Sequence, residues 1–268
     1  MSERDMDEAQ QEERQVGKVS LELDGHVAVV ELRDPPANFF DRDVLAAVAD
    51  AGERATAEGA RAIVLCSQGR HFCAGARLAD ATGGLDPRAS AAAVYEQALR
   101  IFRFEIPVVA AVQGAAVGGG LGLACAADFR VAGPKCRFEA NFSRLGFHCG
   151  FALSLTLPRI VGQTRAELML YTGRALRGAE AYAAGLADRF AELGEERAAA
   201  IALARELAGA APLAVRSMRA TMRAGLLDRL EAALAHELDE QERLWRTEDA
   251  ATGITASLER RDPVFRAR

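Results

Sequence analysis

The chain has 268 residues, of which 50% are hydrophobic and 26% charged, and its formal net charge at pH 7 is −5. This size allows one large domain, or a core domain with an appendage, around a sizeable buried core. The acidic balance argues against a nucleic-acid-binding protein, which normally presents a basic face. No apolar run reaches the length of a membrane span, and the charged first residues lack the apolar stretch of a signal peptide. These features predict a soluble cytoplasmic protein without membrane or nucleic-acid partners.

The use of cysteine agrees with that compartment. The five cysteines are an odd number, and four of them lie in or next to apolar segments. There is no CxxC motif and no Cys/His pair at the spacing of metal ligands. We therefore expect reduced thiols and no bound metal.

The first half of the chain predicts strands that alternate with helices. After a polar, acidic tail (residues 1–18), the segment 19–32 carries apolar residues on both sides of an Asp-Gly turn, which is typical of a β-hairpin. Asp41 is placed to cap a helix that has an apolar face. Two short apolar runs, RAIVLC and IPVVAAV, predict buried strands with a helix around residues 91–104 between them. This alternation predicts an α/β fold with a mainly parallel sheet.

The second half of the chain predicts helices. From about residue 163 the strand pattern fades, and successive stretches rich in Ala, Leu and Arg follow, among them ERAAAIALARELAG, PLAVRSMRATMRAGL and LEAALAHELDEQERLW. We expect three parts: a disordered tail over 1–18, a core over 19–200 and a helical oligomerisation region over 201–268. Such a helical region often packs against another subunit, although it could equally cover its own core.

Two of the predicted strands lead directly into glycine-rich turns. RAIVLC is followed by HFCAGARL, and VVAAV is followed by QGAAVGGGLGLA. Ligands of α/β sheets bind at the carboxyl ends of strands, and glycine allows a positive φ and a close approach. A helix that begins at Gly119 would direct free N–H groups to the same place. Each turn alone is also explained by tight packing, and neither matches GxxxxGK[ST] or GxGxxG.

Together the two turns resemble the enoyl-CoA hydratase/isomerase superfamily, which has the crotonase fold. Its pattern runs roughly FxAGxDL and then KPxxAAxxGxAxGGGxxLAxxxDxxxA, and here HFCAGARL and VQGAAVGGGLGLACAADFRVA follow it. The likeness extends through PPAN and the downstream helical stretches, and covers about residues 19–265. It implies a crotonase-like spiral of β-β-α units with C-terminal helices, assembled as a homotrimer or a dimer of trimers.

The resemblance also implies an oxyanion hole for the thioester carbonyl of an acyl-CoA. Carried over residue by residue, its two donors are the backbone amides of Ala76 and Gly119. Two fixed donors stabilise the enolate oxygen, and one such donor is typically worth roughly 3 kcal/mol. Ala74 and Leu78 would contact coenzyme A, which enters only as part of the substrate. Arg260 would contact its phosphates, but a solvated basic turn explains this residue equally well.

Three positions depart from the family pattern. Hydratases of the family carry two glutamates that hold and activate water, and these positions fall on Gly122 and Phe142. The aspartate used by dienoyl isomerases falls on Gly150. None of these three residues can move a proton, so we do not expect a conventional hydratase mechanism. Glu139 lies close by, but at a predicted strand position that would aim it elsewhere.

His148 is the remaining candidate for proton transfer in this loop, because its side chain titrates near neutral pH. It would act as a general base on an acidic α-carbon, or as an acid towards an enolate. The alternative is a histidine packed beneath the loop with one nitrogen satisfied. Cys149 fits a poorly exposed thiol better than a nucleophile. His71 fits a brace for its turn, and Asp128 matches the family's structural aspartate.

Three functions stay open at this point. The leading hypothesis is an enzyme that reacts through a thioester enolate, by isomerisation, decarboxylation or carbon–carbon bond chemistry rather than standard hydration. The second is an enoyl-CoA hydratase with a non-standard acid/base. The third is a non-catalytic acyl-CoA-binding protein that has kept the oxyanion hole.

Overall fold

The computed structural model describes residues 14–77 and 86–268, and a seven-stranded sheet forms its core. In spatial order the strands are β1 (Arg14–Val16), β2 (Val19–Asp24), β3 (Val27–Leu32), β4 (Ala62–Ser67), β5 (Val108–Val112), β7 (Phe129–Ala132) and β10 (Arg189–Phe190). The β1-β2-β3 meander is antiparallel, and each later pair is parallel. The predicted hairpin and the mainly parallel sheet are confirmed.

A second, smaller sheet carries the second glycine-rich turn. β6 (Ala115–Val117) pairs in parallel with β8 (Arg137–Glu139), which pairs antiparallel with β9 (Ala175–Arg177). The sequence did not predict this sheet, because strands of three residues are too short for a period to be recognised. β6 ends next to Gly118, so this sheet positions the start of the helix that follows.

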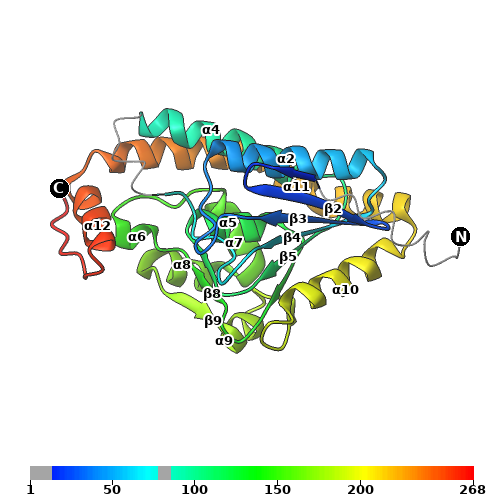
Figure 1. Ribbon diagram of the computed structural model, residues 1–268. Helices are drawn as coiled ribbons and strands as arrows, with labels where there is room; N and C mark the ends of the chain where they lie inside the picture. The colour runs from blue at the N-terminus through cyan, green and yellow to red at the C-terminus, as the bar shows by residue number, and fades with distance from the viewer. Residues whose placement is uncertain (1–13, 78–85) are drawn as a thin grey trace, which may run out of the picture.

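Helices cover both faces of the large sheet: α2, α4 and α11 lie on one side and α10 on the other (Figure 1). The longer helices are α2 (Arg42–Ala57), α4 (Pro87–Phe102), α5 (Gly119–Ala126), α7 (Leu153–Val161), α8 (Gln163–Thr172), α10 (Glu196–Ala208), α11 (Pro212–Trp245) and α12 (Glu248–Leu258). Two short ones are α6 (Phe142–Leu145) and α9 (Gly178–Ala183). The Asp41 side chain accepts from the Val44 amide at 2.8 Å, which confirms the predicted cap of α2.

Residues of β4 alternate between the two apolar layers. Ile63 and Leu65 belong to the larger cluster, together with side chains of α2 and α4, whereas Val64 and Cys66 face α10. A strand buried on both faces needs apolar residues at consecutive positions. This requirement explains why RAIVLC reads as a continuous apolar run.

Secondary structure continues across both predicted domain boundaries. Residues 14–16 lie within the predicted tail but form the edge strand β1. The sequence did not reveal this strand, because it is short and has no apolar period. Residues 1–13 lie outside the described part. The boundary at 200/201 cuts through α10, whose Ala200, Leu203 and Ala204 pack against the sheet and belong to the core. α11 is one continuous helix and packs on α4 and α7 of its own chain. An oligomerisation role for 201–268 stays a prediction.

The described residues hold little that points to metals or membranes. No single helix among them is long and apolar enough to span a membrane; α10 and α11 meet the test only as a pair, bent by 107° at their break. No group of three or more His, Cys, Asp or Glu side chains within 14–77 and 86–268 could hold a metal ion. All five cysteines are free thiols and buried.

Candidate active site

The two glycine-rich turns lie side by side, and backbone hydrogen bonds hold them together. The Cys73 amide donates to the Ala115 carbonyl, and the Val117 amide donates to the Cys73 carbonyl, both at 3.0 Å. Gly75 has a φ of +86°, and a Cβ built on it would lie 3.3 Å from the nitrogen of Gly119. The tip of the first turn therefore contacts the first residue of α5.

The amides of Ala76 and Gly119 donate to no protein acceptor within the described residues. Gly119 begins α5, so its N–H has no acceptor inside the helix and lies at the positive end of the helix dipole. Ala76 is exposed and forms an isolated β-bridge with Phe40. This bridge leaves the Ala76 amide unused, because the Phe40 amide donates to the Gly75 carbonyl at 3.0 Å. Two neighbouring unshared donors are what an oxyanion requires, and the structure brings these two predicted residues together.

Aromatic rings surround Gly122, the position that the resemblance assigns to the first hydratase glutamate. A Cβ on Gly122 would lie 2.5 Å from the Cβ of Phe151, which is buried. The ring of Phe151 packs against Phe40 and Phe102, at centroid distances of 5.5 and 6.3 Å. The Phe40 ring also covers Gly119, where it would lie 2.5 Å from an added Cβ. Position 122 therefore has no room for a carboxylate.

Phe142 and Gly150 stand at the positions that the resemblance assigns to the other two acids. Phe142 is buried, and its ring comes within 3.8 Å of a Cβ built on Gly118. A Cβ on Gly150 would overlap the Tyr95 hydroxyl and lie 2.6 Å from the amide nitrogen of Gln241. Phe142 therefore makes the wall next to the turn at Gly118 apolar, and Gly150 has no room for a side chain.

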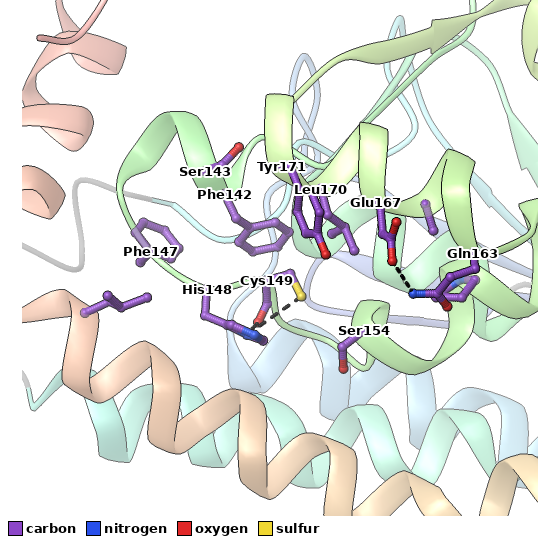
Figure 2. A pocket seen from close by; sticks show the side chains of 13 residues that line it. Phe142, Ser143, Phe147, His148, Cys149, Ser154, Gln163, Glu167, Leu170 and Tyr171 are labelled. Atoms are coloured by element: carbon purple, nitrogen blue, oxygen red, sulfur yellow. Dashed lines mark hydrogen bonds between the residues drawn. The ribbon is translucent and has the colours of Figure 1, made fainter. Parts of the chain in front are cut away.

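A cavity of about 380 Å³ opens next to Phe142. Its walls come from the loop after α6, from α7 and α8, and from the end of α11. The apolar part of the lining includes Phe147, Leu170 and Leu244. Figure 2 shows the polar side chains of His148, Cys149 and Ser154 on the side of the cavity that faces α11. Cavities of this size hold small-molecule ligands.

His148 lies at this wall, half-buried, with one ring nitrogen satisfied. Its Nδ1 lies 2.8 Å from the Cys149 carbonyl oxygen, and because a carbonyl only accepts, Nδ1 carries the proton in the neutral ring. Nε2 is then the basic nitrogen. The ring also contacts the exposed His236 of α11, edge to face, at a centroid distance of 5.7 Å. His148 thus combines a satisfied nitrogen with a place at the cavity.

Cys149 is a thiol and not a thiolate. Burial raises the pKa of its side chain, and the charge of Glu237 raises it further. The Sγ atom lies 3.7 Å from His148 Nδ1, which already bonds the carbonyl. A protonated thiol is a poor nucleophile, so Cys149 contributes shape and a weak donor to the cavity.

A buried carboxylate that the sequence analysis missed, that of Glu237 on α11, lies behind this loop. Its side chain is 0% exposed and accepts from the Ala152 amide at 2.7 Å, the Ser154 amide at 2.9 Å and the Ser154 hydroxyl at 2.6 Å. Burial raises the pKa of Glu237 to about 7, although the donors to it act in the opposite direction. Because this pKa lies above the ordinary value, the protonated form of Glu237 favours the folded state over the unfolded chain. This contribution to the free energy of unfolding is lost as the pH rises through about 7.

The buried face of α11 held a signal for this residue. Leu226, Leu230 and Leu234 recur every four residues, and Glu237 takes the next position of the same stripe. A carboxylate in an apolar stripe is unusual, because a buried charge is costly unless it is hydrogen-bonded. The helix predicted over this segment carries no expected role for Glu237.

Two other candidates have structural roles. The Ala115 amide donates to His71 Nδ1 at 3.2 Å, which confirms that His71 braces its turn. Burial lowers the pKa of this imidazole, and Arg70 and Arg137 lower it further, so the neutral form that accepts the bond is favoured. Glu139 ends β8, as predicted, and forms an ion pair with Arg137 at 2.7 Å.

The predicted contacts to coenzyme A stay predictions. Ala74 is half-buried, and its amide is bonded to the Ala37 carbonyl at 2.9 Å. Arg260 is exposed just beyond the end of α12. Leu78 lies outside the described residues.

Comparisons with known proteins identify the family. The family model Enoyl-CoA hydratase/isomerase matches residues 22–268. The chain is 33% identical over 256 residues to a Bacillus subtilis (strain 168) protein named "Probable enoyl-CoA hydratase", covering 92% of this chain and 98% of that protein. It is 34% identical over 251 residues to cyclohexa-1,5-dienecarbonyl-CoA hydratase of Thauera aromatica, covering 91% and 94%.

A solved structure agrees with this assignment. The crystal structure of an enoyl-CoA hydratase/isomerase from Pseudoalteromonas atlantica T6c matches with a TM-score of 0.84 and 29% identity, over 93% of this chain and 100% of that one. The chain therefore belongs to the enoyl-CoA hydratase/isomerase family of acyl-CoA enzymes. The predicted crotonase-like α/β fold is confirmed.

Proposed function

We propose that the protein binds an acyl-CoA thioester and forms its enolate, with the carbonyl oxygen between the amides of Ala76 and Gly119. The pair of adjacent, unshared N–H groups is the observation that carries this proposal. Enolate formation by proton abstraction breaks an α C–H bond; the proton goes to a base and the electron pair moves onto the thioester oxygen. Isomerisation and carbon–carbon bond chemistry start from this enolate, and decarboxylation reaches it by loss of CO₂.

The lining of the site supports enolate chemistry over addition of water. Hydration needs an acid and a base that hold a water molecule at the double bond. Gly122 and Phe142 occupy the positions where the family resemblance places these groups, and Phe151 fills the space next to Gly122. The result is an apolar wall next to the GGG turn, which disfavours water as a reactant.

His148 is the proposed proton carrier. Its Nδ1–H bond to the Cys149 carbonyl orients the ring and leaves Nε2 as the base. It lines the same cavity as Phe142, whose ring reaches the GGG turn. Phe142 is therefore the link between the cavity that holds His148 and the turn that presents Gly119.

Hydrogen exchange at the α-carbon tests this proposal. In D₂O we expect the protein to exchange an α-hydrogen of a saturated acyl-CoA, such as hexanoyl-CoA, for deuterium, as followed by mass spectrometry. Loss of a general base typically costs 10²–10⁴-fold, so His148→Gln should slow exchange by about 10²-fold or more. His236→Gln is the matched control, because His236 is the exposed partner in the same ring pair. Equal exchange rates in the two variants would remove His148 from the mechanism.

A hydratase with a non-standard acid/base is the second candidate, because relatives at 33–34% identity bear hydratase names. Rapid hydration of crotonyl-CoA without α-exchange would favour it. Tight binding of CoA esters without exchange or turnover would favour a non-catalytic binding protein. We further propose a trimer or a dimer of trimers; exposed Leu213, Met218 and Met222 on α11 support an interface there.

A further inference from the structure

The segment from His148 to Ser154 is attached to α11 at both ends. Near its start, the Gln241 side chain donates to the His148 carbonyl at 3.1 Å. Near its end, the carboxylate of Glu237 receives the amides of Ala152 and Ser154. Gln241 and Glu237 are four residues apart on one helix and so lie on the same face. One face of α11 therefore holds both ends of the wall that carries His148.

The turn inside this segment needs such support. Phe151 and Ala152 have φ values of +60° and +57°, a left-handed conformation that residues with a side chain adopt only at a cost. Phe151 is the side chain that fills the space next to Gly122. The Ala152 and Ser154 amides lie at the start of α7, where helix N–H groups have no partner inside the helix. The Glu237 carboxylate satisfies both of them.

We propose that Glu237 is a positioning residue of the acyl cavity: its carboxylate fixes the Phe151–Ala152 turn and thereby the place of His148. The catalytic consequence rests on the proposed function. The ionised carboxylate can accept all three bonds from Ala152 and Ser154. A protonated one must donate its own O–H, and the Ser154 hydroxyl can accept it only by reversing its present bond. Protonation is therefore expected to loosen the turn.

The surroundings of Glu237 place this change near neutral pH. Within the described residues no cation forms an ion pair with it, and burial raises its pKa to about 7. The titratable groups around it are Tyr95 of α4, Cys149, and the His148–His236 pair with Glu240 next to it. Burial raises the pKa values of Tyr95 and Cys149, so both stay protonated near pH 7. The two imidazoles are the groups that a pH titration must separate from Glu237.

Trp245 reports on the segment without any substrate. It is the single tryptophan of the chain, and its ring lies 4.9 Å from that of Phe147, the residue before His148. We expect the Trp245 emission of the unmodified protein to titrate with a midpoint near pH 7. Glu237→Gln should lack this transition, while His148→Gln and His236→Gln should keep it. Ser154→Ala removes a donor that favours the ionised form, so its midpoint should move to higher pH.

Deuterium exchange supplies the catalytic readout. A small displacement of a reacting group strongly slows a reaction, so Glu237→Gln should lower exchange at pH 8 by about tenfold or more, with affinity for the CoA ester unchanged. The proposal is overturned if Glu237→Gln keeps the wild-type Trp245 transition, or loses it and still exchanges at the wild-type rate. If the unmodified protein exchanges with no thioester, the proposed function fails, and the Trp245 titration alone decides whether Glu237 controls the segment.

Discussion

Asp128→Ala is expected to lower the free energy of unfolding by about 3–5 kcal/mol, because it leaves two arginines without their counterion. Asp128 accepts from Arg219 Nε at 2.9 Å, from Arg223 at 2.8 Å and from the Val108 amide at 2.8 Å. Arg223 is only 8% exposed, and Arg219 is largely buried. The network joins α11 to the first residue of β5 and to the segment that follows α5, so its loss should also release α11.

Urea denaturation of the full chain measures this effect. The matched control is Asp228→Ala, which removes an exposed aspartate of α11 and should change stability by no more than about 0.5 kcal/mol. A loss below about 1 kcal/mol for Asp128→Ala would mean that the buried arginines find other acceptors, and that this aspartate does not hold the helix on the core.

Gly120→Ala is expected to slow α-hydrogen exchange by about 10²–10³-fold, the cost of losing one oxyanion donor. A Cβ on Gly120 would overlap the backbone carbonyl of Cys73, which also accepts from the Val117 amide. Backbone cannot rotate away as a side chain can, so the two turns must separate. The amide of Gly119 then moves away from that of Ala76.

Gly225→Ala controls for this substitution. Gly225 lies within α11 with no atom within 4 Å of an added Cβ, and alanine there should preserve exchange and slightly stabilise the helix. Melting curves separate a folding defect from a catalytic one. A folded Gly120→Ala protein that exchanges at close to the wild-type rate would argue that the oxyanion lies elsewhere.

Much of the fold was predictable because its signals are local. The Asp-Gly turn of the first hairpin, the Asp41 cap and the apolar run of β4 each depend on a few neighbouring residues. The two glycine-rich turns were equally clear, since a positive φ at Gly75 and a crowded Gly120 leave a glycine requirement in the sequence. Family resemblance then assigned the amides that these turns present.

The rest of the site depends on contacts between distant segments. Glu237 bonds Ser154, which lies more than eighty residues earlier in the chain, and no local pattern connects the two. The left-handed turn at Phe151 and Ala152 carries no glycine that would mark it. The continuity of α11 was missed because PLAVRSMRATMRAGL and LEAALAHELDEQERLW have their own apolar patterns. The helix runs on through Gly225, near the end of the first stretch, where an added side chain would meet no neighbour.

The infrared absorption of a bound thioester tests the central claim most directly. A saturated acyl-CoA labelled with ¹³C at its carbonyl gives an isotope-edited carbonyl band in the complex. Two backbone donors at Ala76 and Gly119 should shift this band to lower wavenumber than in water, and Gly120→Ala should reverse most of the shift. A bound carbonyl band at or above its position in water, unchanged in Gly120→Ala, would contradict an oxyanion hole at these two amides.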